Sequence, residues 1–323
     1  MLLRLSLRNQ KRSLPQMHKL SPLTFPFLWI ALLLVSATTA SSMTILQGQR
    51  VLVTGAGRGI GRAIALICHK HGARVAIASR TDSELEETIS LAAAATTAAA
   101  TTSSWTDTTM MALPCDVTNP TQVESIVQQV VDRWGGLDIL INNAGGAQPI
   151  KGPVDLLSNN AQELTTLLQL NVVAVHSVTS AVVKLAMMSN QGGRILNISS
   201  KAGKVGLPNM SFYVASKFAL EGLTASWAAE LADRNIMVNS ISPGMVDTQS
   251  FPKAPGKPGV RTAESIEDAL IMALTAPKKY SGHYVHVDEL DMVRKCELPD
   301  WSAWKKIDEE PIEEFLPPAD FDK

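Results

Sequence analysis

The chain has 323 residues, of which 46% are hydrophobic and 18% charged, and its formal net charge is -1. This composition excludes a disordered or collagen-like chain, and the near-neutral charge predicts no binding to nucleic acid. The three cysteines, Cys68, Cys115 and Cys296, are too sparse for a disulfide framework, and no residues have the spacing of metal ligands, so no metal site is expected.

The small net charge hides two oppositely charged ends. Residues 1–42 carry five basic residues and no acidic one, whereas residues 288–323 carry twelve acidic and five basic residues. We therefore divide the chain into an N-terminal targeting or anchor segment (1–42), a central domain (43–287) and an acidic C-terminal extension (288–323).

The N-terminal segment combines basic residues with an apolar run over 23–35 and the small residues 37–40. This pattern is typical of a secretory signal peptide cleaved after Ala40, and it predicts the secretory pathway or endoplasmic reticulum. The run is short for a spanning helix, which needs about 20 apolar residues, but a tilted anchor would associate residues 20–40 with a membrane. Two alternatives stay open: a cytoplasmic protein if translation starts at Met43, and an organelle-targeting presequence.

Strand-like and helix-like segments alternate along the central domain. The apolar strand-like runs are Val51–Val53, Val75–Ala78, Met111–Pro114, Leu137–Ile141, Ile195–Ile198, Met237–Ile241 and Tyr284–Val287. The helix-like segments are 60–71, 82–92, 120–133, 160–188, 211–233 and 263–275. The alternation predicts a single doubly wound α/β domain of the Rossmann type, with a mostly parallel seven-stranded sheet flanked by helices. Residues 92–112, rich in Ala, Thr and Ser, are expected to lead into a surface loop.

A glycine-rich turn follows the first strand and opens the first helix. It reads Thr54-Gly55-Ala56-Gly57-Arg58-Gly59-Ile60-Gly61, a TGxxxGxG spacing. Glycines allow the backbone to approach a pyrophosphate, and the helix N-terminus supplies N–H donors. The turn therefore predicts a dinucleotide site that includes Gly55, Arg58, Gly59, Ile60 and Gly61.

The end of the second strand bears on the choice of dinucleotide. An acidic residue there would bind the ribose 2′-hydroxyl of NAD, whereas an arginine accommodates the 2′-phosphate of NADP. This strand ends in Ser79-Arg80, with no acid until Asp82, and Arg58 supplies a second base. These residues favour NADP(H) over NAD(H).

Tyr213 and Lys217 are four residues apart on a predicted helix, so they share one face of it. A phenol with a pKa near 10 is a poor acid or base at neutral pH, and a nearby ammonium is expected to lower that pKa. The pair therefore predicts general acid–base chemistry.

These motifs occur in order with Asn142-Asn143-Ala144-Gly145 and Pro243-Gly244, and together they resemble the short-chain dehydrogenase/reductase family over about residues 45–287. The resemblance implies that Tyr213 exchanges the proton, that Lys217 also binds the nicotinamide ribose, that Ser200 binds the substrate carbonyl and that Asn171 fixes a water of the proton relay. It further implies cofactor contacts from Asp116, Val117, Asn143, Ala144, Gly145, Pro243, Gly244, Val246 and Thr248. Asn142 is expected instead to tie strands together.

The expected function is hydride transfer between NADP(H) and a small-molecule carbonyl or alcohol substrate, such as a ketone, an aldehyde, an oxoacyl or a steroid-like compound. A homo-oligomer is also expected from the resemblance. The alternative is a regulatory or scaffold protein of the same fold that binds cofactor without turnover. The short insert 249–260, with three prolines, predicts an open substrate site, and Asp288-Glu289-Leu290-Asp291 departs from the family's Asp-Gly-Gly, which puts its C-terminal subunit contacts in doubt.

Overall fold

The computed structural model describes residues 45–98, 109–148, 161–190, 192–249, 252–253, 257–288 and 305–306. The chain divides into two units, Met1–Met43 and Thr44–Lys323, and all described residues belong to the second. The predicted leader and most of the acidic extension lie outside the described residues, as do parts of the insert 249–260.

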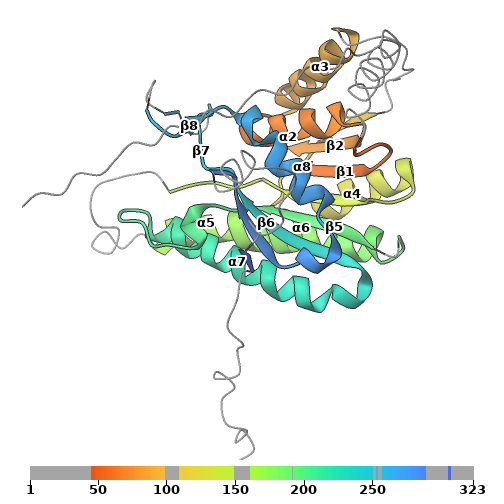
Figure 1. The fold of residues 1–323 in the computed structure, drawn as a ribbon. Coiled ribbons are helices and arrows are strands. Elements are labelled where there is room, and N and C mark those ends of the chain that lie inside the picture. Colours follow the sequence, from red (N-terminus) through yellow and green to blue (C-terminus); the bar gives the residue numbers. More distant parts are fainter. Residues whose placement is uncertain are drawn as a thin grey trace, which may run out of the picture. The chain divides into compact units, whose positions relative to one another are not determined.

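A parallel sheet of seven strands, in the order β9-β6-β5-β4-β1-β2-β3, forms the centre of the domain (Figure 1). The strands are β1 (Arg50–Thr54), β2 (Arg74–Ser79), β3 (Met110–Pro114), β4 (Ile139–Asn142), β5 (Gly193–Ile198), β6 (Ile236–Ser242) and β9 (His283–His286). The predicted doubly wound α/β class is therefore confirmed. The short β10 (Lys305–Lys306), which the sequence did not predict, adds an antiparallel eighth strand beside β9.

Helices connect the strands and cover the sheet. They are α2 (Gly59–Lys70), α3 (Asp82–Ala98), α4 (Pro120–Trp134), α5 (Ala161–Leu168), α6 (Ala174–Val182), α7 (Ser211–Glu230) and α8 (Glu267–Thr275). The π-helical turn η3 (Gln169–Val173) joins α5 to α6, and a second π-helical turn, η4 (Val183–Met187), extends α6, so that one continuous helix runs over Ala161–Met187. This helix is long and apolar enough to cross a membrane, but half of its most apolar stretch is buried inside the domain, as in a core helix.

Side chains that alternate along each strand build two cores, one on each face of the sheet. In β1, Val51 and Val53 pack with residues of α2 and α8, whereas Leu52 packs with residues of α4, α6 and α7. Strands buried on both faces need continuous apolar sequence, which is why these runs were visible in the sequence.

Two helix boundaries differ from the expectation. α3 continues to Ala98, into the Ala/Thr-rich stretch expected to form a loop, because alanine has the highest helix propensity of all residues. The predicted helix 263–275 begins as a 3-10 turn, η7 (Ala263–Ile266), before α8.

Candidate active site

The strand order reverses between β4 and β1, and in open α/β sheets ligands bind in the crevice at such a point. Here the ends of the two strands are tied together. The hydroxyl of Thr54 accepts from the backbone N–H groups of Asn143 and Ala144, both at 3.1 Å. In return the amide of Asn143 donates to the carbonyls of Thr54 at 2.9 Å and Gly55 at 3.1 Å. We name this group of bonds the Thr54–Asn143 latch.

A cavity of about 810 Å³ opens at these strand ends. Its wall contains every residue predicted to bind cofactor: Gly55, Arg58, Gly59, Ile60, Gly61, Ser79, Arg80, Asp116, Val117, Asn143, Ala144, Gly145, Tyr213, Lys217, Pro243, Gly244, Val246 and Thr248. Ser200 lines it as well. Asn171 does not, because it is buried behind the wall.

The glycine turn is shaped for close backbone contact. Gly55 and Gly59 have positive φ, and a Cβ placed on Gly61 would overlap the Gly55 carbonyl. The side chain of Arg58, the N-cap residue of α2, makes no capping hydrogen bond, whereas the side chain of Asn119 caps α4 in this way. The first N–H groups of α2 thus fit an anionic pyrophosphate.

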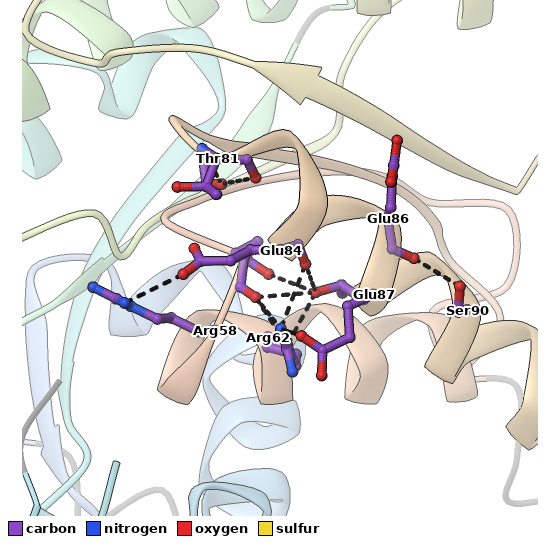
Figure 2. A network of polar contacts seen from close by, with 11 residues as sticks. Arg58, Arg62, Thr81, Glu84, Glu86, Glu87 and Ser90 are labelled. Carbon is purple, nitrogen blue, oxygen red and sulfur yellow. Dashed lines mark hydrogen bonds and ion pairs between the residues drawn. The ribbon is translucent and has the colours of Figure 1, made fainter. Parts of the chain in front are cut away.

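Two side-chain contacts fasten this turn to α3, and Figure 2 shows the first of them, between Arg62 and Glu87. Arg62 of α2 donates from Nε to the Gly57 carbonyl at 2.9 Å and pairs with Glu87 of α3 at 2.6 Å. The buried hydroxyl of Thr88 donates to the Ala56 carbonyl at 3.2 Å. Arg62, which stands where GxGxxG would have its third glycine, is therefore an anchor of the turn.

The wall beyond the turn contains the residues expected around the adenosine, and one that the sequence did not suggest. Glu84, from the first turn of α3, lines the cavity and pairs with Arg58 at 3.2 Å. The carboxylate of Asp116 accepts from the hydroxyl of Thr118 at 2.7 Å and from its N–H at 2.9 Å. These hydrogen bonds, with the charge of Arg80, lower the pKa of Asp116.

At the other end of the cavity, Tyr213 and Lys217 share one face of α7. The Lys217 ammonium donates to the Ile198 carbonyl at 2.9 Å and lies 5.7 Å from the centre of the Tyr213 ring. Burial lowers the pKa of Lys217 to about 8, against a smaller raising effect of Glu221. The pKa of Tyr213 is raised rather than lowered, because burial outweighs the opposing hydrogen bond of Ser200. The expected net lowering of the Tyr213 pKa is therefore wrong for this structure.

Ser200 follows β5 and begins a 3-10 turn, η5 (Lys201–Gly203). Its hydroxyl accepts from the N–H of Ala202 at 3.1 Å and caps that turn while facing the cavity. Capping uses a lone pair of the oxygen and fixes its position, and the same hydroxyl hydrogen-bonds Tyr213, so the two side chains lie together at the cavity.

Asn171 lies in the π turn η3, and its amide is fully engaged. Its Nδ2 donates to the Gly146 carbonyl at 2.9 Å and to the Ser216 hydroxyl at 3.0 Å, while its Oδ1 accepts from the Gly146 N–H at 2.8 Å. The side chain thus fastens the loop after β4 to α7. Its predicted water contact stays a prediction.

Asn142 and Gln148 hold the surroundings of the site together. Asn142 donates to Asn197 of β5 at 2.9 Å and so ties two strands, as expected. Gln148, which the sequence did not suggest, accepts from the N–H groups of Phe212 at 3.1 Å and Tyr213 at 3.4 Å. It thereby supplies the acceptor that the first turn of α7 lacks, a role that only the tertiary structure reveals.

The doubly wound sheet, the glycine turn at its switch point and the Tyr–Lys helix define the class of dinucleotide-binding oxidoreductases. The family model described as short chain dehydrogenase matches residues 49–257. The chain therefore belongs to the short-chain dehydrogenase/reductase family, whose members use a nicotinamide cofactor.

Named relatives agree with this membership. The chain is 33% identical over 212 residues to a 3-oxoacyl-(acyl-carrier-protein) reductase of Thermotoga maritima. The matched region is 66% of this chain and 80% of that protein. It is 30% identical over 249 residues to an uncharacterized oxidoreductase of Staphylococcus aureus, covering 77% and 98%. Among solved structures, a short-chain type dehydrogenase/reductase from Mycobacterium marinum matches with a TM-score of 0.62 and 27% identity, covering 75% and 94%.

Proposed function

We propose that this protein is an NADP(H)-dependent reductase of ketones or aldehydes. The observation that carries the proposal is the grouping of Ser200, Tyr213 and Lys217 on the wall of the same cavity as the glycine turn. Arg58 and Arg80, on the same wall, support NADP(H) because a guanidinium binds phosphate well.

The side chains have distinct tasks in this proposal. The bound nicotinamide supplies the hydride. The hydroxyl of Ser200 donates a hydrogen bond to the substrate oxygen, and the Tyr213 hydroxyl gives that oxygen a proton. The ammonium of Lys217 stabilises the phenolate left behind and holds the ribose. Asn171 keeps the loop after β4 in place.

Other residues of the cavity wall bear on the substrate. They include the apolar Leu207, Met210 and Met245 and the polar Gln162 and Thr166 of α5. A carbonyl compound with an apolar portion, such as an oxoacyl or steroid-like substrate, suits this mixed lining. The oxoacyl reductase among the relatives supports the first of these.

The test is NADPH oxidation by the purified full chain with a panel of ketones, aldehydes and oxoacyl thioesters. Oxidation that depends on one class of carbonyl is the expected result. Cofactor binding without turnover on any member of the panel would contradict the proposal and favour the regulatory or scaffold alternative.

Changing Tyr213→Phe should reduce turnover by about 10²- to 10⁴-fold, because it removes the proton donor but keeps the ring. NADPH affinity, followed by fluorescence titration, should change by no more than about twofold. The control is Tyr280→Phe, which removes a phenol from η8 (Lys278–Tyr280), outside the wall of the cavity. Retained activity in Tyr213→Phe would refute the role given to Tyr213.

A further inference from the structure

Glu84 places a carboxylate among the groups that the proposed function assigns to the 2′-phosphate of NADP(H). Figure 2 shows Glu84 reaching from α3 toward Arg58 of the glycine turn, and their charged atoms lie 3.2 Å apart. The side chains of Arg58 and Glu84 are 47% and 26% exposed, so both can meet a ligand.

The second oxygen of this carboxylate points toward the end of β2. A Cβ built on Gly57 would lie 2.8 Å from Oε2 of Glu84 and also 2.8 Å from the hydroxyl oxygen of Ser79. The two oxygens are therefore neighbours across Gly57, and Glu84 lies between Ser79 and Arg58. A side chain at position 57 would fill this space.

This placement changes the balance of charge around the adenosine ribose. Ser79, Arg58 and Arg80 alone would form a neutral-to-basic site suited to phosphate. With Glu84 between them, a 2′-phosphate meets a like charge and competes with the carboxylate for Arg58. A free 2′-hydroxyl, in contrast, has a carboxylate acceptor to which it can donate.

We propose, on the basis of the proposed function, that Glu84 is a specificity-determining residue that moderates the preference for NADP(H) and enables the site to bind NAD(H) as well. The sequence places no acid at the end of β2, where this discrimination is ordinarily sought; Glu84 provides one from α3. The site thus binds both cofactors: Arg58 and Arg80 favour binding of the 2′-phosphate, and Glu84 disfavours it.

Adenosine fragments test this without any turnover. The dissociation constants of adenosine 2′,5′-bisphosphate and adenosine 5′-monophosphate are measured by calorimetry on the full chain and on Glu84→Gln. Glutamine keeps the shape and an acceptor oxygen but removes the charge. We expect the bisphosphate to bind about tenfold more tightly to the variant, and the monophosphate affinity to change by no more than about twofold.

The matched control is Glu86→Gln, which removes the same charge two residues further along α3. Figure 2 shows Glu86 on the side of Ser90, away from Arg58, and it does not line the cavity. It should leave the ratio of the two affinities within about twofold of the wild-type value. Thermal melting of both variants checks that the fold is retained.

Each outcome decides between the alternatives. The deciding quantity is the affinity for the bisphosphate divided by the affinity for the monophosphate. If this ratio is unchanged or lower in Glu84→Gln, the inference is overturned and Glu84 is only a positioning residue for Arg58. A wild-type protein that binds neither fragment would refute the adenosine site itself. Carbonyl reduction is measured separately, so a failed substrate panel does not decide this question.

Discussion

Glu221 lies one helical turn beyond Lys217 on α7 and is only 3% exposed. Its carboxylate accepts from the Ser240 hydroxyl at 3.0 Å and lies 3.6 Å from the ammonium of Lys204, whose charge also sits over the Tyr284 ring. Burial raises the pKa of Glu221, while Ser199, Lys204 and Ser240 oppose that rise. The charge of Glu221 raises the pKa of Lys217, against the larger effect of burial, and so favours the charged form of Lys217.

This arrangement predicts a pH dependence. Because burial lowers the pKa of Lys217 from 10.5 to about 8, its ammonium is present below that pH and is lost above it. We expect kcat/KM for carbonyl reduction to fall as the pH rises through about 8. In Glu221→Gln the Lys217 pKa loses its raising partner, so this fall should begin at lower pH.

The control for this shift is Glu230→Gln, an exposed position on the same helix. A pH profile that does not move in Glu221→Gln, with activity merely lower at every pH, would show that Glu221 acts only by packing. Glu221→Asp, which keeps the charge, should restore part of the wild-type profile.

At this scale the sequence predicted residues that belong to motifs and missed those that act through tertiary contacts. Tyr213 and Lys217 are recognisable because one helix sets their spacing. Glu84 and Gln148 are not, because their partners come from other elements. For Glu84 the nearest signal was an acid in the first turn of α3, which alone indicates only a favourable helix dipole.

Among the elements, α3 is more than a covering helix, because Thr88 and Glu87 hold the glycine turn through Ala56 and Arg62. The seven strands of the parallel sheet could be predicted to within two residues because their continuous apolar sequence suits burial on both faces. The two π turns could not be predicted from the sequence. A π turn adds only one residue to a helical turn, and the apolar pattern of the buried helix is still that of an α-helix.

The contact between α3 and the turn can be tested with Thr88→Val, which keeps the shape and removes the hydroxyl. The change leaves the Ala56 carbonyl without this donor and should lower the free energy of unfolding by about 1–2 kcal/mol. A looser turn should also weaken NADPH binding by about fivefold. Denaturant unfolding and fluorescence titration measure the two effects.

Ser90→Ala is the comparison for this variant, because the Ser90 hydroxyl donates to the backbone carbonyl of Glu86 on the exposed side of the same helix, at 2.9 Å. It should leave both quantities nearly unchanged. If the Thr88→Val variant loses stability but binds NADPH normally, the hydroxyl supports the fold and does not hold the glycine turn.

For the whole molecule, two large apolar side chains bear on the expected homo-oligomer. Val173 of η3 and Phe218 of α7 are 44% and 47% exposed on elements that pack together. Exposed apolar groups that lie together are typical of protein interfaces. We expect light scattering to give a multiple of the 34.7 kDa chain mass, or of the shorter chain if the leader is removed.

Phe218→Lys should shift this mass toward that of the monomer, because a charge would be buried in the interface. Leu91→Lys is the matched control, since Leu91 is 43% exposed on α3, on the other side of the sheet. An unchanged mass in Phe218→Lys, with the fold intact by circular dichroism, would place the interface elsewhere.

The Thr54–Asn143 latch has a consequence for how this molecule moves. It adds four hydrogen bonds between β1 and β4, which are paired neighbours at the point where the strand order of the doubly wound sheet reverses. The half that carries the glycine turn and the half that leads to Tyr213 cannot hinge apart there without breaking these bonds together. We therefore expect the distance between the adenosine and nicotinamide ends of the site to be nearly the same with and without cofactor. Any closing over a substrate must come from segments outside the sheet.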